Sequence, residues 1–178
     1  MDTARYIEKI AVLFGKVMTS TQFDREAEDI GLTPSQLQGL SYLFHHGKSS
    51  VGDMAQGLDI SHPAAVKLVS RLGKKGLVER NPSETDRRVS IVGLTQQGEQ
   101  LIRKVLTHRT EFLSKALNRI DQSELETVMR GLESLLAAVL TDREIVQSAC
   151  LKCGDDHIGC CVVNRTHFEV TGKAIRDH

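Results

Sequence analysis

Apolar residues recur at three- and four-residue spacing along most of this chain, which is the pattern of amphipathic helices. The spacing predicts a first helix over Tyr6–Ser20 and a last one with apolar positions from Leu125 to Val139. Between them we expect four more helices, beginning after Thr33, at Val51, after Ser61 and after Thr95. The regular pattern stops near Ile145.

Helix-capping residues support these starting points. Thr33 precedes Pro34 and stands three residues before Gln36, which is the spacing of a capping box with proline at the first helical position. Ser61 and Thr95 are good N-caps, and Asp121 with Glu124 has the same spacing as a capping pair.

One segment has the alternation of strands instead. After Gly76 the runs LVER and VSIVGL flank NPSETDRR, a stretch of turn-forming and charged residues, so we predict a β-hairpin with a charged tip. A winged helix-turn-helix has this order of elements: short helices, a tight turn, a further helix and a hairpin. The predicted fold is therefore mainly α with a small β-hairpin wing.

The chain divides on this pattern into four parts. We expect an N-terminal dimerisation helix (1–30), a winged helix-turn-helix (31–95), C-terminal dimerisation helices (96–145) and a tail (146–178). Dimerisation is expected because Leu125, Leu132 and Val139 belong to a heptad-like apolar seam that needs a partner.

Charge is balanced overall, at 23 basic and 23 acidic residues, but it is unevenly placed. Between Ser61 and Ser90 there are seven Lys and Arg against three acidic residues. Such asymmetry indicates a nucleic-acid-binding face. The helix after Ser61 has an apolar face and a second face formed by Lys67, Ser70, Arg71 and Lys74.

A DNA-recognition helix needs this combination, because its polar side chains enter the major groove while its back packs on the domain. Ser61, His62, Pro63 and Ala64 would enter first. Read by itself, the basic face could equally be an ordinary solvated surface. The wing favours DNA, since Arg87 and Arg88 could reach a minor groove and Asp86 could brace one of them.

The stretches LTPSQLQGLSYLFHHG, VGDMAQGLDISHPAAVKLVSRLGKKGLVER and ETDRRVSIVGLTQQGEQL resemble the MarR family of bacterial regulators. The resemblance covers Thr33 to Leu106 and implies a homodimer that represses transcription from pseudo-palindromic operators. It also implies release of DNA on binding a small molecule or metal, or on oxidation. By this resemblance Arg88 takes the minor-groove position. The recognition-helix positions fall to Ser61, Pro63, Ala64, Lys67, Ser70 and Arg71.

All four cysteines lie in the tail, in CLKCGDDHIGCCVVN. Cys150, Cys153, His157 and Cys161 supply three thiols and an imidazole within twelve residues, a complete tetrahedral set for one structural Zn²⁺. Cys160 is the rival fourth ligand. The alternatives are an iron–sulfur cluster, a redox-active pair, or four incidental cysteines. The common pattern of the family lacks this tail.

Other functional classes fit less well. An enzyme built on the metal would need an open coordination position and a nucleophile–base set, and neither is evident, so we expect no enzymatic activity. An interaction adaptor would not need a basic wing. The N-terminus is charged where a signal peptide would be apolar, and LLAAVL is too short to span a membrane, so a cytoplasmic protein is expected.

Overall fold

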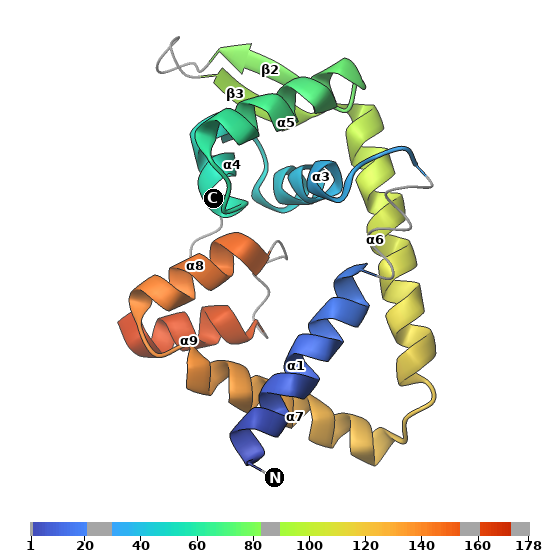
Figure 1. Cartoon of the computed structure of the whole chain (residues 1–178), viewed down its shortest axis with the longest axis vertical. Coiled ribbons are helices and arrows are strands. Elements are labelled where there is room, and N and C mark those ends of the chain that lie inside the picture. The colour runs from blue at the N-terminus through green and yellow to red at the C-terminus, as the bar shows by residue number, and fades with distance from the viewer. Residues whose placement is uncertain (1, 21–29, 83–89, 154–160, 172–178) are drawn as a thin grey trace.

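The computed structural model describes residues 2–20, 30–82, 90–153 and 161–171. Figure 1 shows a helix-turn-helix unit with its small sheet at one end and long helices leading away from it. The helices are α1 (Thr3–Ser20), α3 (Pro34–His46), α4 (Val51–Gly57), α5 (His62–Lys74), α6 (Gln96–Leu117), α7 (Gln122–Val139), α8 (Arg143–Cys153) and α9 (Val162–Thr171). The strands are β1 (Ser49–Ser50), β2 (Val78–Pro82) and β3 (Ser90–Leu94). The predicted mainly α fold with a small β-hairpin wing is confirmed.

The helix starts follow the predicted caps. The Thr33 hydroxyl accepts from the Gln36 backbone amide, and the Gln36 side-chain oxygen accepts from the Thr33 backbone amide at 3.0 Å. Ser50 and Asp53 form a second capping box at α4. At α7, Asp121 occupies the predicted N-cap position, but its side chain makes no capping hydrogen bond.

The three strands form an antiparallel sheet in the order β1-β3-β2. Val78 pairs with Leu94 and Pro82 with Ser90, which gives the predicted hairpin. The short strand β1 was not predicted, because two serines carry no strand signal of their own. Its pairing of Ser49 with Val92 joins the wing to the chain before α4.

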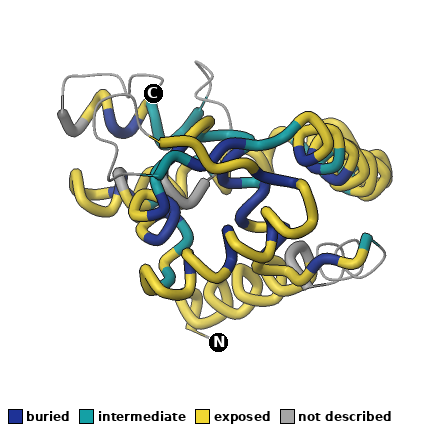
Figure 2. The backbone as a smooth tube through the Cα atoms, turned by 90° about the horizontal axis from the view of Figure 1, so that it is seen from above, coloured by how far each residue is buried: buried dark blue, intermediate teal, exposed yellow. Residues whose placement is uncertain are grey.

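One hydrophobic core holds the helix-turn-helix and the sheet together. Leu37, Leu40 and Leu43 of α3 meet the apolar face of α5 there, and Met54 and Val92 are also fully enclosed. The core continues past the expected domain boundary at residue 95, since Ile102 and Val105 of α6 belong to it. Figure 2 shows the buried residues concentrated in this part of the chain.

Helices α1 and α7 bury little within one chain. Residues 3–17 of α1 are all exposed, and no residue of α7 is buried. Many of the exposed positions on these helices are large and apolar. On α1 they are Tyr6, Ile7, Ile10, Val12, Leu13, Phe14 and Val17, and on α7 they are Val128, Met129, Leu132, Leu135, Leu136 and Val139.

Regular structure continues beyond Ile145, against the prediction from periodicity. Helix α8 crosses the expected boundary at 145/146, and α9 packs against both α8 and α7. Val146 is fully buried, and Arg165 of α9 forms an ion pair with Glu133 of α7 at 3.2 Å. Helix α8 also contacts α4 of the helix-turn-helix. The hairpin of α8 and α9 therefore lies between the two ends of the molecule (Figure 1).

Candidate nucleic-acid interface

Helix α5 is built as a recognition helix would be. The Ser61 hydroxyl caps it by accepting from the Ala64 amide at 3.4 Å, and a proline stands in its first turn. Four residues on one side are buried in the core, namely Ala65, Leu68, Val69 and Leu72. These contacts hold the helix on the domain and leave its other side in solvent.

The predicted DNA-contacting residues of α5 lie on this solvent side. Each of the following is exposed: Ser61, His62, Pro63, Ala64, Lys67, Ser70, Arg71 and Lys74. Helix α5 contains no acidic residue, so its exposed face is cationic without internal neutralisation. The geometry matches the predicted arrangement, while contact of these side chains with DNA stays a prediction.

The turn between α4 and α5 fixes the angle of the two helices. Asp59 adopts a left-handed backbone with φ of 56°, and the Ile60 amide donates to the Ala55 carbonyl at 3.0 Å. Gly57 lies directly under the Tyr42 ring, where a Cβ would overlap the ring atoms. A small residue is therefore required where α4 crosses α3.

The wing is joined to α5 by a short, fully hydrogen-bonded junction. The Leu77 amide donates to the Leu72 carbonyl at 3.1 Å, and the Thr95 amide donates to the Leu77 carbonyl at 3.1 Å. The Thr95 hydroxyl donates to the Gly76 carbonyl at 2.7 Å. Gly76 has a φ of 70°, which favours glycine. The start of the hairpin is thereby fixed relative to the end of the recognition helix.

Beyond this junction the wing reaches the limit of the described residues. Strands β2 and β3 converge on the segment that contains Asp86, Arg87 and Arg88, and these three predicted contacts lie outside the described part of the chain. Sequence reasoning missed one cation that is described, Arg80 of β2. Its Nη2 donates to the Val66 carbonyl of α5 at 3.2 Å.

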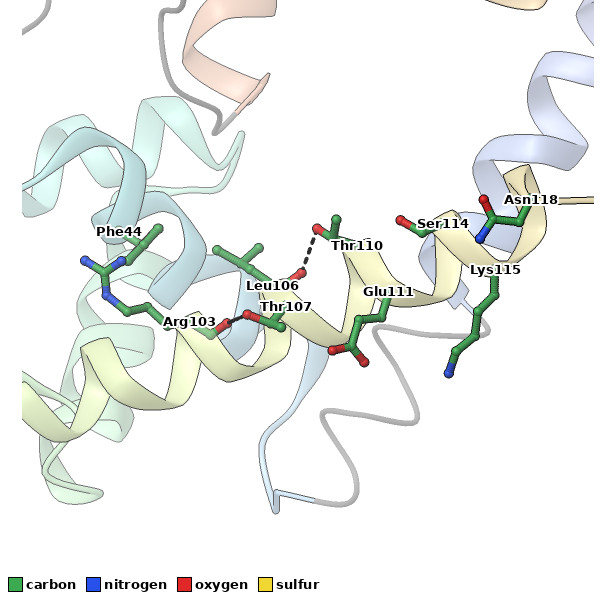
Figure 3. Close-up of a pocket in the computed structure, with 9 residues that line it drawn as sticks. All are labelled: Phe44, Arg103, Leu106, Thr107, Thr110, Glu111, Ser114, Lys115 and Asn118. Carbon is green, nitrogen blue, oxygen red and sulfur yellow. Dashed lines mark hydrogen bonds between the residues drawn. The ribbon is translucent and has the colours of Figure 1, made fainter. Parts of the chain in front are cut away.

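A groove of about 670 Å³ runs along α6, and the described residues that line it belong to α6 and, at Phe44, to α3. At one end the Arg103 guanidinium stacks on the Phe44 ring, 4.8 Å from its centroid. Figure 3 shows the remaining lining side chains along one side of α6. They are Leu106, Thr107, Thr110, Glu111, Ser114, Lys115 and Asn118.

Arg103 is also paired with Glu99 at 2.7 Å, so its charge is partly balanced at the mouth of this groove. The Thr107 and Thr110 hydroxyls bond to helix carbonyls one turn back, at 3.0 and 3.1 Å. The groove thus offers an aromatic ring, a cation and hydroxyl oxygens, and sequence reasoning did not find it because its residues have no distinctive motif.

The predicted metal ligands are only partly placed. Cys150 and Cys153 belong to the last turn of α8, and half-buried Cys161 immediately precedes α9. His157 and Cys160 lie outside the described residues. Within the described residues, no three His, Cys, Asp or Glu side chains form a group that could hold a metal ion. The described helices include none long and apolar enough to cross a membrane.

A helix-turn-helix with an exposed cationic recognition helix and an adjoining β-hairpin defines the class of winged-helix DNA-binding proteins. A family model described as the MarR family matches residues 30–89. The transcriptional regulator YfiV of Bacillus subtilis is 32% identical over 133 residues, covering 74% of this chain and 83% of YfiV. The chain belongs to the MarR family of transcriptional regulators.

Other similarities agree with this assignment. The transcriptional repressor MdtR of B. subtilis is 27% identical over 135 residues, covering 76% of this chain and 86% of MdtR. A MarR family protein from Bacillus stearothermophilus has the same fold, with a TM-score of 0.70, 23% identity, and coverage of 78% of this chain and 98% of that one. About a fifth of the present chain is thus left without a counterpart in that structure.

Proposed function

We propose that this protein is a homodimeric, sequence-specific transcriptional repressor that binds pseudo-palindromic DNA. The observation that carries the proposal is the exposed cationic face of α5, held by the core beside the wing. MdtR, a relative of similar length, is a repressor, which favours repression over activation. Two recognition helices in a two-fold dimer would read half-sites about 10 base pairs apart, or a multiple of that spacing.

The dimer forms through α1, α7 and the end of α6. Their apolar side chains are exposed in the single chain, Leu13 at 60% and Val139 at 58%, and such a surface is too large to be left in water. A two-fold interface uses the same surface on both copies, and these helices lie opposite the DNA-binding unit. A second copy would therefore cover them while leaving both α5 helices free.

A small-molecule effector is the favoured signal. The groove is lined by Phe44 of α3 and by residues along α6, so its occupant would affect the position of α6 relative to the DNA-binding unit. Arg103 and Phe44 would suit a planar ligand with a negative charge. Such a ligand lowers DNA affinity only if it binds the free conformation more tightly than the DNA-bound one.

The test is selection of binding sites from a random duplex library with the full-length protein, followed by titration of the selected duplex. We expect a two-fold related sequence bound at two protomers per duplex, more tightly than random DNA by at least about a thousandfold. A protein that shifts no duplex at low salt would instead be an interaction adaptor, and the proposal would fail.

The proposal also includes a structural zinc site in the tail, residues 146–178. Cys150 and Cys153 are three residues apart in the sequence of α8. Cys153 is the last residue of α8, Cys161 immediately precedes α9, and the two helices are in contact. With His157 these thiols would complete one Zn²⁺ per chain, with Cys160 as the rival ligand. An iron–sulfur cluster or a disulfide redox sensor is the alternative occupant of the same residues.

A further inference from the structure

Arg80 connects the two DNA-reading elements of this protein directly. Within β2 only Val78 is buried, and the four residues after it are exposed. Residues two apart in a strand share a face, so Arg80 is on the same side of β2 as Val78, the side that packs on α5. Its Nη2 donates to the Val66 carbonyl in the middle of α5, at 3.2 Å.

The acceptor is well placed for this bond. A helix carbonyl has two lone pairs, and the amide four residues later takes one, so Val66 can accept from Arg80 without losing its helical bond. Val66 is 37% exposed and stands next to Lys67, on the part of α5 that faces solvent. The bond therefore joins β2 to the recognition helix at the edge of the DNA-binding face.

The bond between Arg80 and Val66 is also placed to fix the orientation of the wing relative to α5. At its start, the hairpin is fixed to α5 by the junction at Leu77, and its second strand is held by the pairing of β1 with β3. The bond of Arg80, three residues farther along β2, adds a direct attachment of the outer strand of the wing to α5. Asn81 points the other way, since its amide donates to Glu79 Oε1 at 3.3 Å.

We propose that Arg80 is a positioning residue for DNA reading, which holds the wing at a fixed angle to α5 so that both fit adjacent grooves at once. The inference rests on the proposed DNA binding and adds a role for a residue outside the recognition helix and the wing tip. Loss of such a bond would reduce discrimination between DNA sequences, because only at the selected site do α5 and the wing both make favourable contacts at the same time.

The rival role for Arg80 is a direct contact with a DNA phosphate. The two roles predict different responses to salt. Loss of one phosphate contact lowers the slope of log affinity against log salt by about 0.9 and weakens all duplexes alike. Loss of an internal tether leaves the slope unchanged and weakens the selected duplex more than random DNA.

The experiment compares wild type, Arg80→Met, Arg80→Lys and the control Lys104→Met, which removes an exposed charge on α6. Affinity for the selected duplex and for a random duplex is measured between about 50 and 200 mM KCl, a range that reveals the slope of log affinity against log salt. The melting temperature of each free protein is measured as well. We expect Arg80→Met to weaken the selected duplex about tenfold, a loss of about 1.4 kcal/mol by the affinity relation, with random-duplex affinity unchanged. Arg80→Lys should restore most of this, because one donor suffices.

Three outcomes would overturn the assignment. Equal weakening of both duplexes with a reduced salt slope makes Arg80 a phosphate ligand. Unchanged affinity for both duplexes shows that the bond to Val66 has no role in reading. A large fall in melting temperature, with Arg80→Lys no better, makes Arg80 a residue of the fold alone. If wild type binds no duplex, the proposed function fails, and that result is distinct from all three.

Discussion

Gly98, in the first turn of α6, lies against the backbone carbonyl of Leu77, and a Cβ at position 98 would overlap that oxygen. The same carbonyl accepts the Thr95 amide, and the Thr95 hydroxyl accepts the Gly98 amide at 3.1 Å. The start of α6, the end of α5 and the start of the wing thus meet at one point where no side chain fits.

Gly98→Ala should therefore destabilise the protein by about 2 kcal/mol or more, since the obstacle is backbone and cannot rotate away. The measurement is the free energy of unfolding in urea. Gly52→Ala is the matched control, because this exposed helical glycine has only the Ser50 hydroxyl near its Cβ position, at 3.5 Å. The control should be neutral or slightly stabilising. Equal effects of both substitutions would contradict the close approach at Leu77.

Charges on the apolar stripe of α7 should abolish the proposed dimer. Leu132→Glu with Leu135→Glu would bury two unpaired carboxylates in the interface, which costs several kcal/mol. Sedimentation velocity should then show monomers or aggregates. Ser134→Glu adds a single carboxylate on the opposite side of α7 and should remain dimeric. A double variant that dimerises like wild type would place the interface elsewhere.

Recognition-helix and wing substitutions should differ in kind. Arg71→Ala should change which bases the protein prefers as well as its affinity, at about 1–3 kcal/mol for a base contact. Arg88→Ala should weaken binding to all sites, because a minor-groove or phosphate contact supplies mostly affinity. Repeating the site selection with each variant separates the two effects. Unchanged affinity of Arg88→Ala at moderate salt would remove Arg88 from the interface.

Tyr42 should make the stability fall at alkaline pH. Burial raises the pKa of its hydroxyl above the usual value of about 10, Asp53 adds to the rise, and a hydrogen bond with Ser49 opposes it. Because the folded pKa is the higher one, the contribution of Tyr42 is complete below about pH 10 and is lost as the pH rises through the folded pKa.

Tyr42→Phe should accordingly make the free energy of unfolding less dependent on pH above about pH 10. Met54→Leu is the control, since it alters the same core without a titratable group and should shift stability equally at every pH. An unchanged alkaline slope in Tyr42→Phe would show that another group is responsible.

Metal analysis tests the tail. Protein purified without oxygen should contain one zinc per chain, and Cys150→Ser should lose it, with structural zinc contributing on the order of 10 kcal/mol to folding. A strong chelator should then lower the helix content. Iron with acid-labile sulfide would indicate a cluster instead. Metal-free wild type, or Cys150→Ser with a full complement of zinc, would refute the site. Zinc release with unchanged DNA affinity would leave it structural only.

The parts of this molecule that follow from local chemistry could be predicted from the sequence. Thr33 with Gln36 marks a helix start whatever surrounds it, and the two faces of α5 differ so strongly that burial follows from spacing. At Asp121 the same logic located the helix start but not the capping hydrogen bond, because a correct spacing does not guarantee that the side chain turns to the backbone.

Features that depend on distant partners could not be predicted. Strand β1 exists because Ser49 meets Val92, and the Arg80 bond exists because β2 passes over α5. Helices α8 and α9 were missed for a related reason. Val146 of α8 is fully buried, but the few apolar residues around it form a helical pattern too short to recognise in the sequence. The packing of α9 against α7 and α8 becomes evident only in the structure.

The pairing of β1 with β3 also sets an order of assembly on the ribosome. The sheet is complete once residue 94 has emerged, and the core around it once Val105 has followed. Helix α1 is made first, yet its apolar side chains stay exposed within one chain and would be covered only in the proposed dimer. The winged helix-turn-helix should therefore fold during synthesis, before the chain can form the proposed dimer. Protease digestion of arrested nascent chains of increasing length would reveal whether it does.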